Sequence, residues 1–188
     1  MNYYTYYKKI EPFLCNKKLM RLFFIGFGAF SLLLMLIFLK SMFVVLILLA
    51  ANVFMTLIIY PFRYFLSGIE IVLFSTVLSA AAFGSRVGAI VGFFFVIVHF
   101  ALQHKLNPLN ILIPPLYAII GYVAGLSSAG ITTIGITAVI LYNIFAFFLI
   151  MFAYNGNFVR AFIFNFVNIA FNVFIFARIA PFVLKIVG

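Results

Sequence analysis

The sequence has 188 residues, of which 68% are hydrophobic and only 7% are charged. Because a soluble domain carries about 25% charged residues, this composition excludes a water-exposed globular protein and indicates lipid as the solvent for most of the chain. The net charge of +10 comes from a few Lys and Arg residues placed between apolar segments, not from the folded basic face that a nucleic-acid-binding protein needs. We therefore expect a lipid bilayer around the protein and no nucleic acid as a partner.

The first 21 residues have the composition of a basic and aromatic tail at the membrane surface. Four tyrosines precede five basic residues, and Glu11 is the one acidic residue of this segment. Tyr prefers the headgroup level, and Lys and Arg mark the cytoplasmic side of a membrane. The sequence thus predicts a cytoplasmic interfacial tail over residues 1–21 and a single integral domain over residues 22–188 of a multi-pass protein of the cell membrane. A docking segment for a partner or for anionic lipid is the alternative for the tail.

Apolar segments of the length that crosses a bilayer, roughly 20 residues, follow the tail. They predict an all-α fold, a polytopic transmembrane helical bundle with six to seven spans. The predicted spans cover residues 22–39, 42–60, 68–83, 87–102, 111–125, 131–153 and 159–186. The first two are expected to form a hairpin that turns at Lys40, because their joint length exceeds one crossing, and Pro61 is expected to end the second. If one of them is re-entrant, six spans remain and both termini are cytoplasmic.

Small residues at helical spacing predict the places where helices approach closely. The GxxxG pattern removes side-chain bulk so that a neighbouring backbone can come near, and it is common in membrane helices for packing alone. The predicted positions for helix packing or for a partner interface are Gly26, Gly28, Ala29, Gly84, Gly88, Gly92, Gly121 and Gly125.

Polar residues inside the apolar spans are the candidate functional residues. Three asparagines of the last span recur on one helix face, and a histidine and a glutamine extend the glycine face of the fourth span. The candidate ligand-binding residues are His99, Gln103, Asn143, Asn165, Asn168 and Asn172. They can converge on a ligand if the fourth, sixth and last spans are neighbours. The alternative is that they form hydrogen bonds between helices, each worth about 0.6 kcal/mol.

Glu70 is the one acidic residue beyond the tail. A carboxylate inside a membrane costs about 2.5–3.5 kcal/mol on insertion scales, so a partner is expected, and Arg63 is the candidate for an intramembrane charge pair. One cysteine in the tail, two histidines and this glutamate make no recognisable catalytic or metal-binding constellation. The sequence therefore predicts a protein that is not an enzyme, with no catalytic residue, no metal and no cofactor.

Two segments carry a resemblance to known families. The stretch FGSRVGAIVGFFFVIVHF, followed by a loop and LYAIIGYVAG, resembles the middle of the S components of energy-coupling-factor (ECF) transporters. The end of the chain, NFVNIAFNVFIFARIAPFVLKIV, resembles their terminal asparagine-bearing helix. The MreD family of rod-shape morphogenesis proteins is similar in the same places, at SRVGAIVGFFF, LYAIIGYVAG and AFNVFIF. Together the similar segments span residues 67–188.

The two resemblances imply different functions. The first implies a membrane-embedded substrate-capture subunit of an uptake transporter for a vitamin or other small molecule, with a membrane coupling subunit and two ATPases as partners. The absence of a GxxxxGK[ST] motif agrees with a subunit that has no ATPase activity of its own. The second implies a non-catalytic membrane scaffold that holds cell-envelope membrane proteins together. The sequence leaves both functions open.

Overall fold

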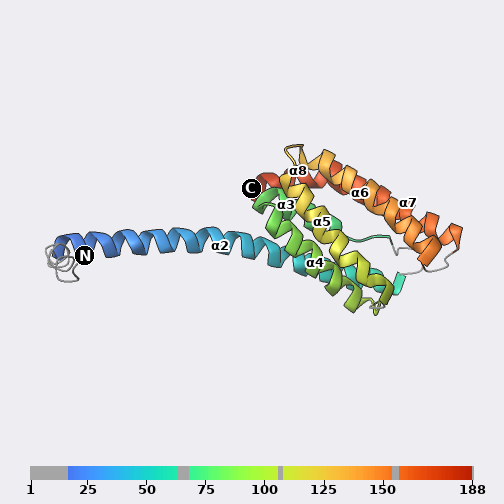
Figure 1. Cartoon of the computed structure of the whole chain (residues 1–188), viewed down its shortest axis with the longest axis horizontal. Helices are drawn as coiled ribbons and strands as arrows, with labels where there is room; N and C mark the ends of the chain where they lie inside the picture. The colour runs from blue at the N-terminus through green and yellow to red at the C-terminus, as the bar shows by residue number, and fades with distance from the viewer. Residues whose placement is uncertain (1–16, 63–67, 106–107, 154–156, 188) are drawn as a thin grey trace, which may run out of the picture. The chain divides into compact units, whose positions relative to one another are not determined.

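The computed structural model describes residues 17–62, 68–105, 108–153 and 157–187. Every regular element in these ranges is helical, so the predicted all-α membrane fold is confirmed (Figure 1). Four helical segments are long and apolar enough to cross a membrane, namely Leu39–Phe62, Ser85–Leu102, Ile131–Phe152 and Ala161–Val187. Two further apolar helices, Val72–Phe83 and Asn110–Leu126, are shorter. The described chain therefore has fewer full-length crossings than the predicted six to seven.

Helix α2 runs without interruption over Lys17–Ile59, so the predicted hairpin at Lys40 is wrong. The prediction rested on length, because a helix of 43 residues is about 65 Å long and a hydrocarbon core is only about 30 Å thick. Neither Lys40 nor Ser41 stops a helix, since both keep the backbone N–H and Lys has a high helix propensity. The helix does end just before Pro61, in the 3-10 turn Tyr60–Phe62, as expected for a residue that has no backbone N–H.

The chain forms two compact units, Met1–Phe43 and Val44–Gly188, and the division falls inside α2. In the first unit the structure describes a single helical stretch, with the side chain of Ile25 exposed. The second unit contains the rest of α2, which contributes Leu48 to the core, and all the later helices. The boundary predicted after Arg21 separates an interfacial tail from a membrane domain, and it stays a prediction, since helix α2 is continuous through both Arg21 and the division between the units.

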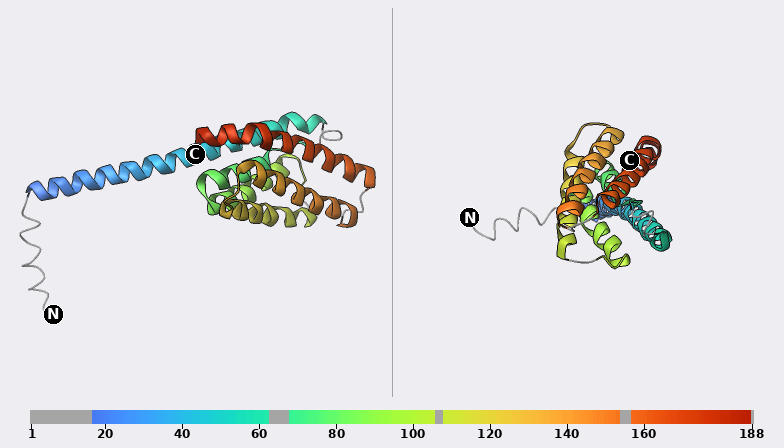
Figure 2. Two further views of the ribbon diagram at one scale, coloured as in Figure 1. Left: turned by 90° about the horizontal axis from the view of Figure 1, so that it is seen from above. Right: turned by 90° about the vertical axis from the view of Figure 1, so that its right-hand side faces the viewer.

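Helix α3, Val72–Phe83, lies at the centre of the second unit. Every residue from Val72 to Ala80 is buried, which is the pattern of a helix enclosed by protein on all sides. Figure 2 shows it among its neighbours, which include α4 (Ser85–Leu102), α5 (Ile113–Leu126), α6 (Ile131–Phe148) and α8 (Ala180–Val187). With 12 residues, α3 is about 18 Å long and too short to cross a bilayer. The chain therefore reaches the interior of the bundle before the helix begins.

Gly84 separates α3 from α4 and lies between the predicted spans 68–83 and 87–102. Its φ of +91° and ψ of 170° lie in a region that glycine adopts readily and that other residues avoid. This conformation ends α3 and allows α4 to return alongside it.

The last span is a helix with a local change of winding. Helix α7, Phe158–Phe174, continues through a π-helical turn, Ile175–Ile179, into α8. The ring of Phe176 fills the space beside Gly135 of α6, where a Cβ atom would collide with it. The hydroxyl of Thr132 donates to the carbonyl oxygen of Phe176 over 3.1 Å. The π-helical turn is thus held against α6 by a ring contact and a hydrogen bond.

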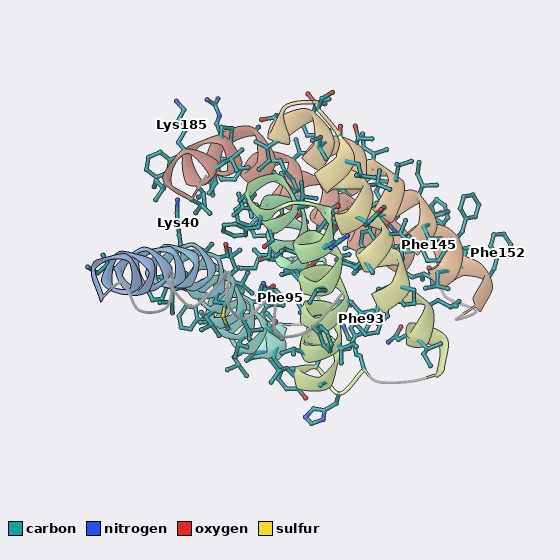
Figure 3. All side chains as sticks on the ribbon, turned by 60° about the vertical axis from the view of Figure 1, so that its left-hand side comes forward. Lys40, Phe93, Phe95, Phe145, Phe152 and Lys185 are labelled. Atoms are coloured by element: carbon teal, nitrogen blue, oxygen red, sulfur yellow. The ribbon has the colours of Figure 1, made fainter. Side chains whose placement is uncertain are left out.

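Large apolar side chains cover the outside of the second unit. Phe152 is 80% exposed and Phe166 is 63% exposed, and Figure 3 shows Phe152 projecting away from the helices. Exposed apolar side chains of this size recur on α4, α5, α6 and α7. Such a surface suits hydrocarbon and not water, because all backbone groups in a helix are satisfied internally and the side chains match the lipid tails. The protein is therefore a membrane-spanning helical protein.

Candidate functional site: a buried polar cluster at the start of α3

The segment Gly68–Ile71 is not helical, although it lies inside the bundle and leads into α3. Gly68 and Glu70 are both buried. A Cβ atom on Gly68 would collide with the backbone of Phe164 and Asn168 in α7, so this position requires glycine for a close approach. Irregular backbone at membrane depth is tolerated where it is buried in protein and its polar groups find partners. The contacts of this segment therefore identify the polar interior of the protein.

Asn168 of α7 is the main partner of the buried segment. Its side chain is fully buried, and its amide nitrogen donates to the carbonyl oxygen of Gly68 over 2.8 Å. Its amide oxygen accepts from the amide nitrogen of Asn143 over 2.8 Å and from that of Asn172 over 3.4 Å. Asn143 lies on α6 and Asn172 lies one turn further along α7. We call these three residues the asparagine cluster.

Glu70 joins this cluster to α5. Its carboxyl group accepts from the backbone N–H of Val72 over 2.7 Å and from the hydroxyl of Tyr117 over 2.8 Å. The backbone N–H of Leu73 and the amide of Asn168 are further hydrogen-bonding neighbours of the carboxyl group. The described partners of Glu70 are thus uncharged donors, two of them at the N-terminus of α3, where the helix dipole also favours an anion. The predicted charge pair cannot be assessed, since Arg63 lies outside the described residues.

Several buried amide oxygens complete the description of the site. Six buried side-chain polar atoms have no hydrogen-bond partner within the described part of the chain, and five of them are amide oxygens. These five belong to Asn52, Gln103, Asn143, Asn165 and Asn172. An amide oxygen accepts hydrogen bonds and cannot donate them. A buried polar group without a partner costs about 1–3 kcal/mol, so a hydrogen-bond donor beside the amide oxygens of Asn143 and Asn172 would offset part of this cost.

His99 lies in a different polar group, between α2 and α4. Its Nδ1 atom lies 2.9 Å from the hydroxyl of Thr56, which donates to the backbone carbonyl oxygen of Asn52 over 2.7 Å. The amide nitrogen of Asn52 in turn donates to the hydroxyl of Ser75 in α3 over 2.8 Å. The described hydrogen bonds of His99 therefore lead to α2 and not to the asparagine cluster.

No described hydrogen bond joins the remaining two ligand-binding candidates, Gln103 and Asn165, to the asparagine cluster. Gln103 follows the last turn of α4 and is buried. Asn165 is buried as well, and its amide nitrogen donates to the carbonyl oxygen of Ala161 in its own helix over 2.7 Å. The structure thus brings together three of the six predicted residues, which are Asn143, Asn168 and Asn172.

The predicted glycine face of α4 is used inside the chain. Gly88 of α4 and Gly121 of α5 approach so closely that a Cβ atom on either would collide with the backbone of the other. Gly92 meets the backbone of Tyr117, and Gly125 meets that of Ser85. These contacts make a continuous seam between α4 and α5, which places Tyr117 against Glu70.

Gly28, inside helix α2, and Gly84, between α3 and α4, behave differently from the glycines of the seam. Around Gly28 in the first unit, and around Gly84, nothing lies within 4 Å of the position that a Cβ atom would occupy. Gly28 is exposed. The surroundings of Gly26 and Ala29 lie outside what the structure describes.

Sequence reasoning missed Gly68, Tyr117, Asn52 and Thr56. The last two are the polar residues of an otherwise apolar run, one helical turn apart, which is the signal that identified the asparagines of the last span. Gly68 precedes Glu70 by two residues, and this proximity to a lone acid was available as a signal too. Tyr117 had no such signal, because a tyrosine in an apolar span is equally suited to the headgroup level.

Comparison with known proteins finds no matching family model, no matching curated protein and no matching solved structure. Among the described residues, no group of three or more His, Cys, Asp or Glu side chains is placed to hold a metal ion. The chemistry that the described site offers is hydrogen bonding from a buried, acceptor-rich cluster with one carboxyl group.

Proposed function

We propose that this protein is a membrane-embedded capture subunit for a small polar molecule, of the kind found in S components of ECF transporters. The observation that carries the proposal is the asparagine cluster beside the non-helical segment Gly68–Ile71. Transporter binding sites characteristically lie near the middle of the bilayer, where a broken helix exposes backbone and polar side chains. Within the described residues, the amide oxygens of Asn143 and Asn172 have no hydrogen-bond partner. In this proposal they bind the captured molecule.

Capture implies partners that complete transport. We propose a membrane coupling subunit and two ATPases as these partners, with the N-terminal tail on the cytoplasmic side of the cell membrane. The excess of Lys and Arg in the first 21 residues supports this orientation.

The test is to purify the protein gently from its native membrane and identify retained small molecules and proteins by mass spectrometry. We expect a retained molecule that Asn143→Leu loses, because the substitution removes an amide oxygen of the cluster. Asn165→Leu is the matched control, since its described hydrogen bond goes to Ala161 of its own helix and none joins it to the asparagine cluster, and it should keep the molecule. Retention that is unaffected by Asn143→Leu, or no retained molecule in any preparation, would count against capture.

A scaffold of the MreD kind is the second candidate. Gly28 is exposed in the first unit with nothing near its Cβ position, and the smooth surface that it offers to another membrane helix suits a scaffold and equally the coupling subunit of a capture system. The glycines of α4 and α5 argue less for this function than the sequence suggested, because they already pack against each other. Stable co-purification of cell-envelope membrane proteins that Gly28→Leu abolishes, without a retained small molecule, would favour the scaffold over capture.

A further inference from the structure

The end of the last span carries two basic side chains on one face of the helix. Arg178 lies in the π-helical turn and Lys185 lies in α8, and both are exposed. They are separated by two helical turns, with the exposed Phe182 between them, so the three side chains recur at the spacing of one helix face. We call these three residues the basic strip. Figure 3 shows Lys185 projecting away from the helices.

The position of the basic strip along the span indicates the headgroup level of a membrane. The span Ala161–Val187 has 27 residues and is about 40 Å long, whereas a hydrocarbon core is about 30 Å thick. Residues 161–177 contain no charged residue, and this stretch alone extends about 26 Å. Because a charged side chain avoids hydrocarbon, Arg178 lies at the edge of the core and Lys185 lies beyond it, about 10 Å further along the helix axis.

Acidic side chains that could neutralise the basic strip are scarce. The whole sequence has two acidic residues, Glu11 in the tail and Glu70. Glu70 is buried, and its carboxyl group is hydrogen-bonded in the interior. Among the described residues, none forms an ion pair with Arg178 or Lys185. The positive charge of the strip is therefore available to an anion that the described part of the chain does not supply.

The apolar side chains beside the two cations indicate which kind of anion fits. Phe174 lies one helical turn before Arg178 and is 60% exposed, and Phe182 of the strip is 66% exposed. A phospholipid supplies both an anionic phosphodiester and acyl chains, whereas an acidic protein surface supplies only the negative charge. The guanidinium of Arg178 can bind a phosphodiester through paired N–H donors, and Lys185 adds a second positive charge. The combination of groups therefore favours a lipid.

The basic strip distinguishes the last span from helices α5 and α6. Both of these helices expose large apolar side chains, such as Ile119 on α5 and Leu141 on α6. Neither Ile113–Leu126 nor Ile131–Phe148 contains a Lys or Arg residue. Lipid acyl chains can contact all three surfaces, but of these three only the last span adds cations for an anionic headgroup.

We propose that the basic strip binds an anionic phospholipid, whose phosphodiester lies between Arg178 and Lys185 and whose acyl chains lie along Phe174. The inference does not depend on the proposed capture function. It assigns a lipid site to the outer surface of the last span, whereas capture concerns the polar interior.

The experiment uses tryptophan fluorescence, because the natural chain contains no tryptophan. Phe174→Trp places a single fluorophore beside the strip, and Leu141→Trp is the matched control, since Leu141 is 61% exposed on α6. Each full-length variant is reconstituted in phosphatidylcholine vesicles that contain an equal fraction of either brominated phosphatidylglycerol or brominated phosphatidylcholine, and quenching by the brominated acyl chains is measured.

At Phe174→Trp we expect phosphatidylglycerol to be preferred over phosphatidylcholine by about five-fold or more, the value for one basic residue near an anionic surface. At Leu141→Trp the two lipids should quench about equally. Equal quenching by the two lipids at Phe174→Trp would overturn the inference. The same preference at both positions would overturn it too, because it would show a general attraction of anionic lipid to a positively charged protein.

Substitutions in the Phe174→Trp protein test the two cations. The double variant Arg178→Gln with Lys185→Gln removes both charges from exposed positions, and it should abolish the preference for phosphatidylglycerol. Lys40→Gln, which removes one exposed charge from α2, is the control and should leave the preference unchanged. An unchanged preference in the double variant, or an equal loss in Lys40→Gln, would contradict the site. If the double variant fails to fold by circular dichroism, the comparison of the two tryptophan positions still decides.

A competition experiment separates a lipid headgroup from a free anion. Inorganic phosphate is added to the Phe174→Trp vesicles at the ionic strength of a chloride control. We expect it to leave the preference for phosphatidylglycerol unchanged, because it lacks the acyl chains that contact the apolar surface. Loss of the preference in phosphate but not in chloride would identify a free phosphate as the ligand and overturn the lipid site.

Discussion

At the scale of single residues, Asn168 has a different role from the asparagines on either side of it. All three share one face of α7 and are buried, as the spacing in the sequence predicts. Asn165 donates to its own helix, whereas Asn168 connects α7 to the segment before α3 and to Asn143 of α6. Identical residue types at equivalent helical positions thus stabilise different parts of the structure, and their neighbours decide which.

We expect Asn168→Leu to lower the free energy of unfolding by about 2 kcal/mol, because it leaves the carbonyl oxygen of Gly68 buried without a donor. Asn165→Leu should cost less than about 1 kcal/mol, since the lost bond lies within one helix. Thermal and denaturant unfolding in detergent, followed by circular dichroism, measures both. Equal destabilisation by the two substitutions would show that Asn168 is not the link described above.

At the scale of elements, the α4–α5 seam and the central helix α3 determine the position of the polar cluster. The glycines of the seam allow α4 and α5 to touch along their backbones, and α5 then presents Tyr117 to Glu70. The GxxxG spacing predicts that a close approach occurs, because it removes bulk from one helix face. It does not indicate which helix comes close, and here the partner is a second glycine pair in the same chain.

Substitution at the seam tests this arrangement. We expect Gly88→Ala to destabilise the protein by about 1–3 kcal/mol, the usual cost of overpacking, because the added Cβ atom would collide with Ala80 and with the backbone of Gly121. Gly28→Ala is the matched control, since nothing lies near its Cβ position, and it should leave stability unchanged or raise it slightly through helix propensity. Melting temperatures of the two variants in the same detergent provide the comparison. A Gly88→Ala protein as stable as Gly28→Ala would mean that the seam is loosely packed.

At the scale of the whole molecule, composition requires a lipid environment and the basic tail indicates an orientation. The exposed phenylalanines of the second unit agree with the first conclusion. The orientation remains a prediction, and it can be tested through the natural Cys15, which is the one cysteine of the chain.

We expect a membrane-impermeant maleimide to label Cys15 in permeabilised cells and to leave it unlabelled in intact cells, because the positive tail should remain in the cytoplasm. Cys15→Ser is the control for unspecific labelling. Labelling in intact cells would place the N-terminus outside and reverse the proposed orientation.

The sequence by itself determined the solvent, the helical fold, the break at Gly84 and part of the set of polar residues that avoid lipid. These properties follow from hydrophobicity, glycine and helical spacing, which are local. The continuous α2 was mispredicted, because its length exceeds one bilayer crossing and no local signal at Lys40 forces a turn. Only the tertiary structure decided that His99 pairs with Thr56 and that Asn168 pairs with Gly68 and Asn143. The physical reason is that a hydrogen bond between helices depends on which faces pack together, and packing is set jointly by all the helices around α3.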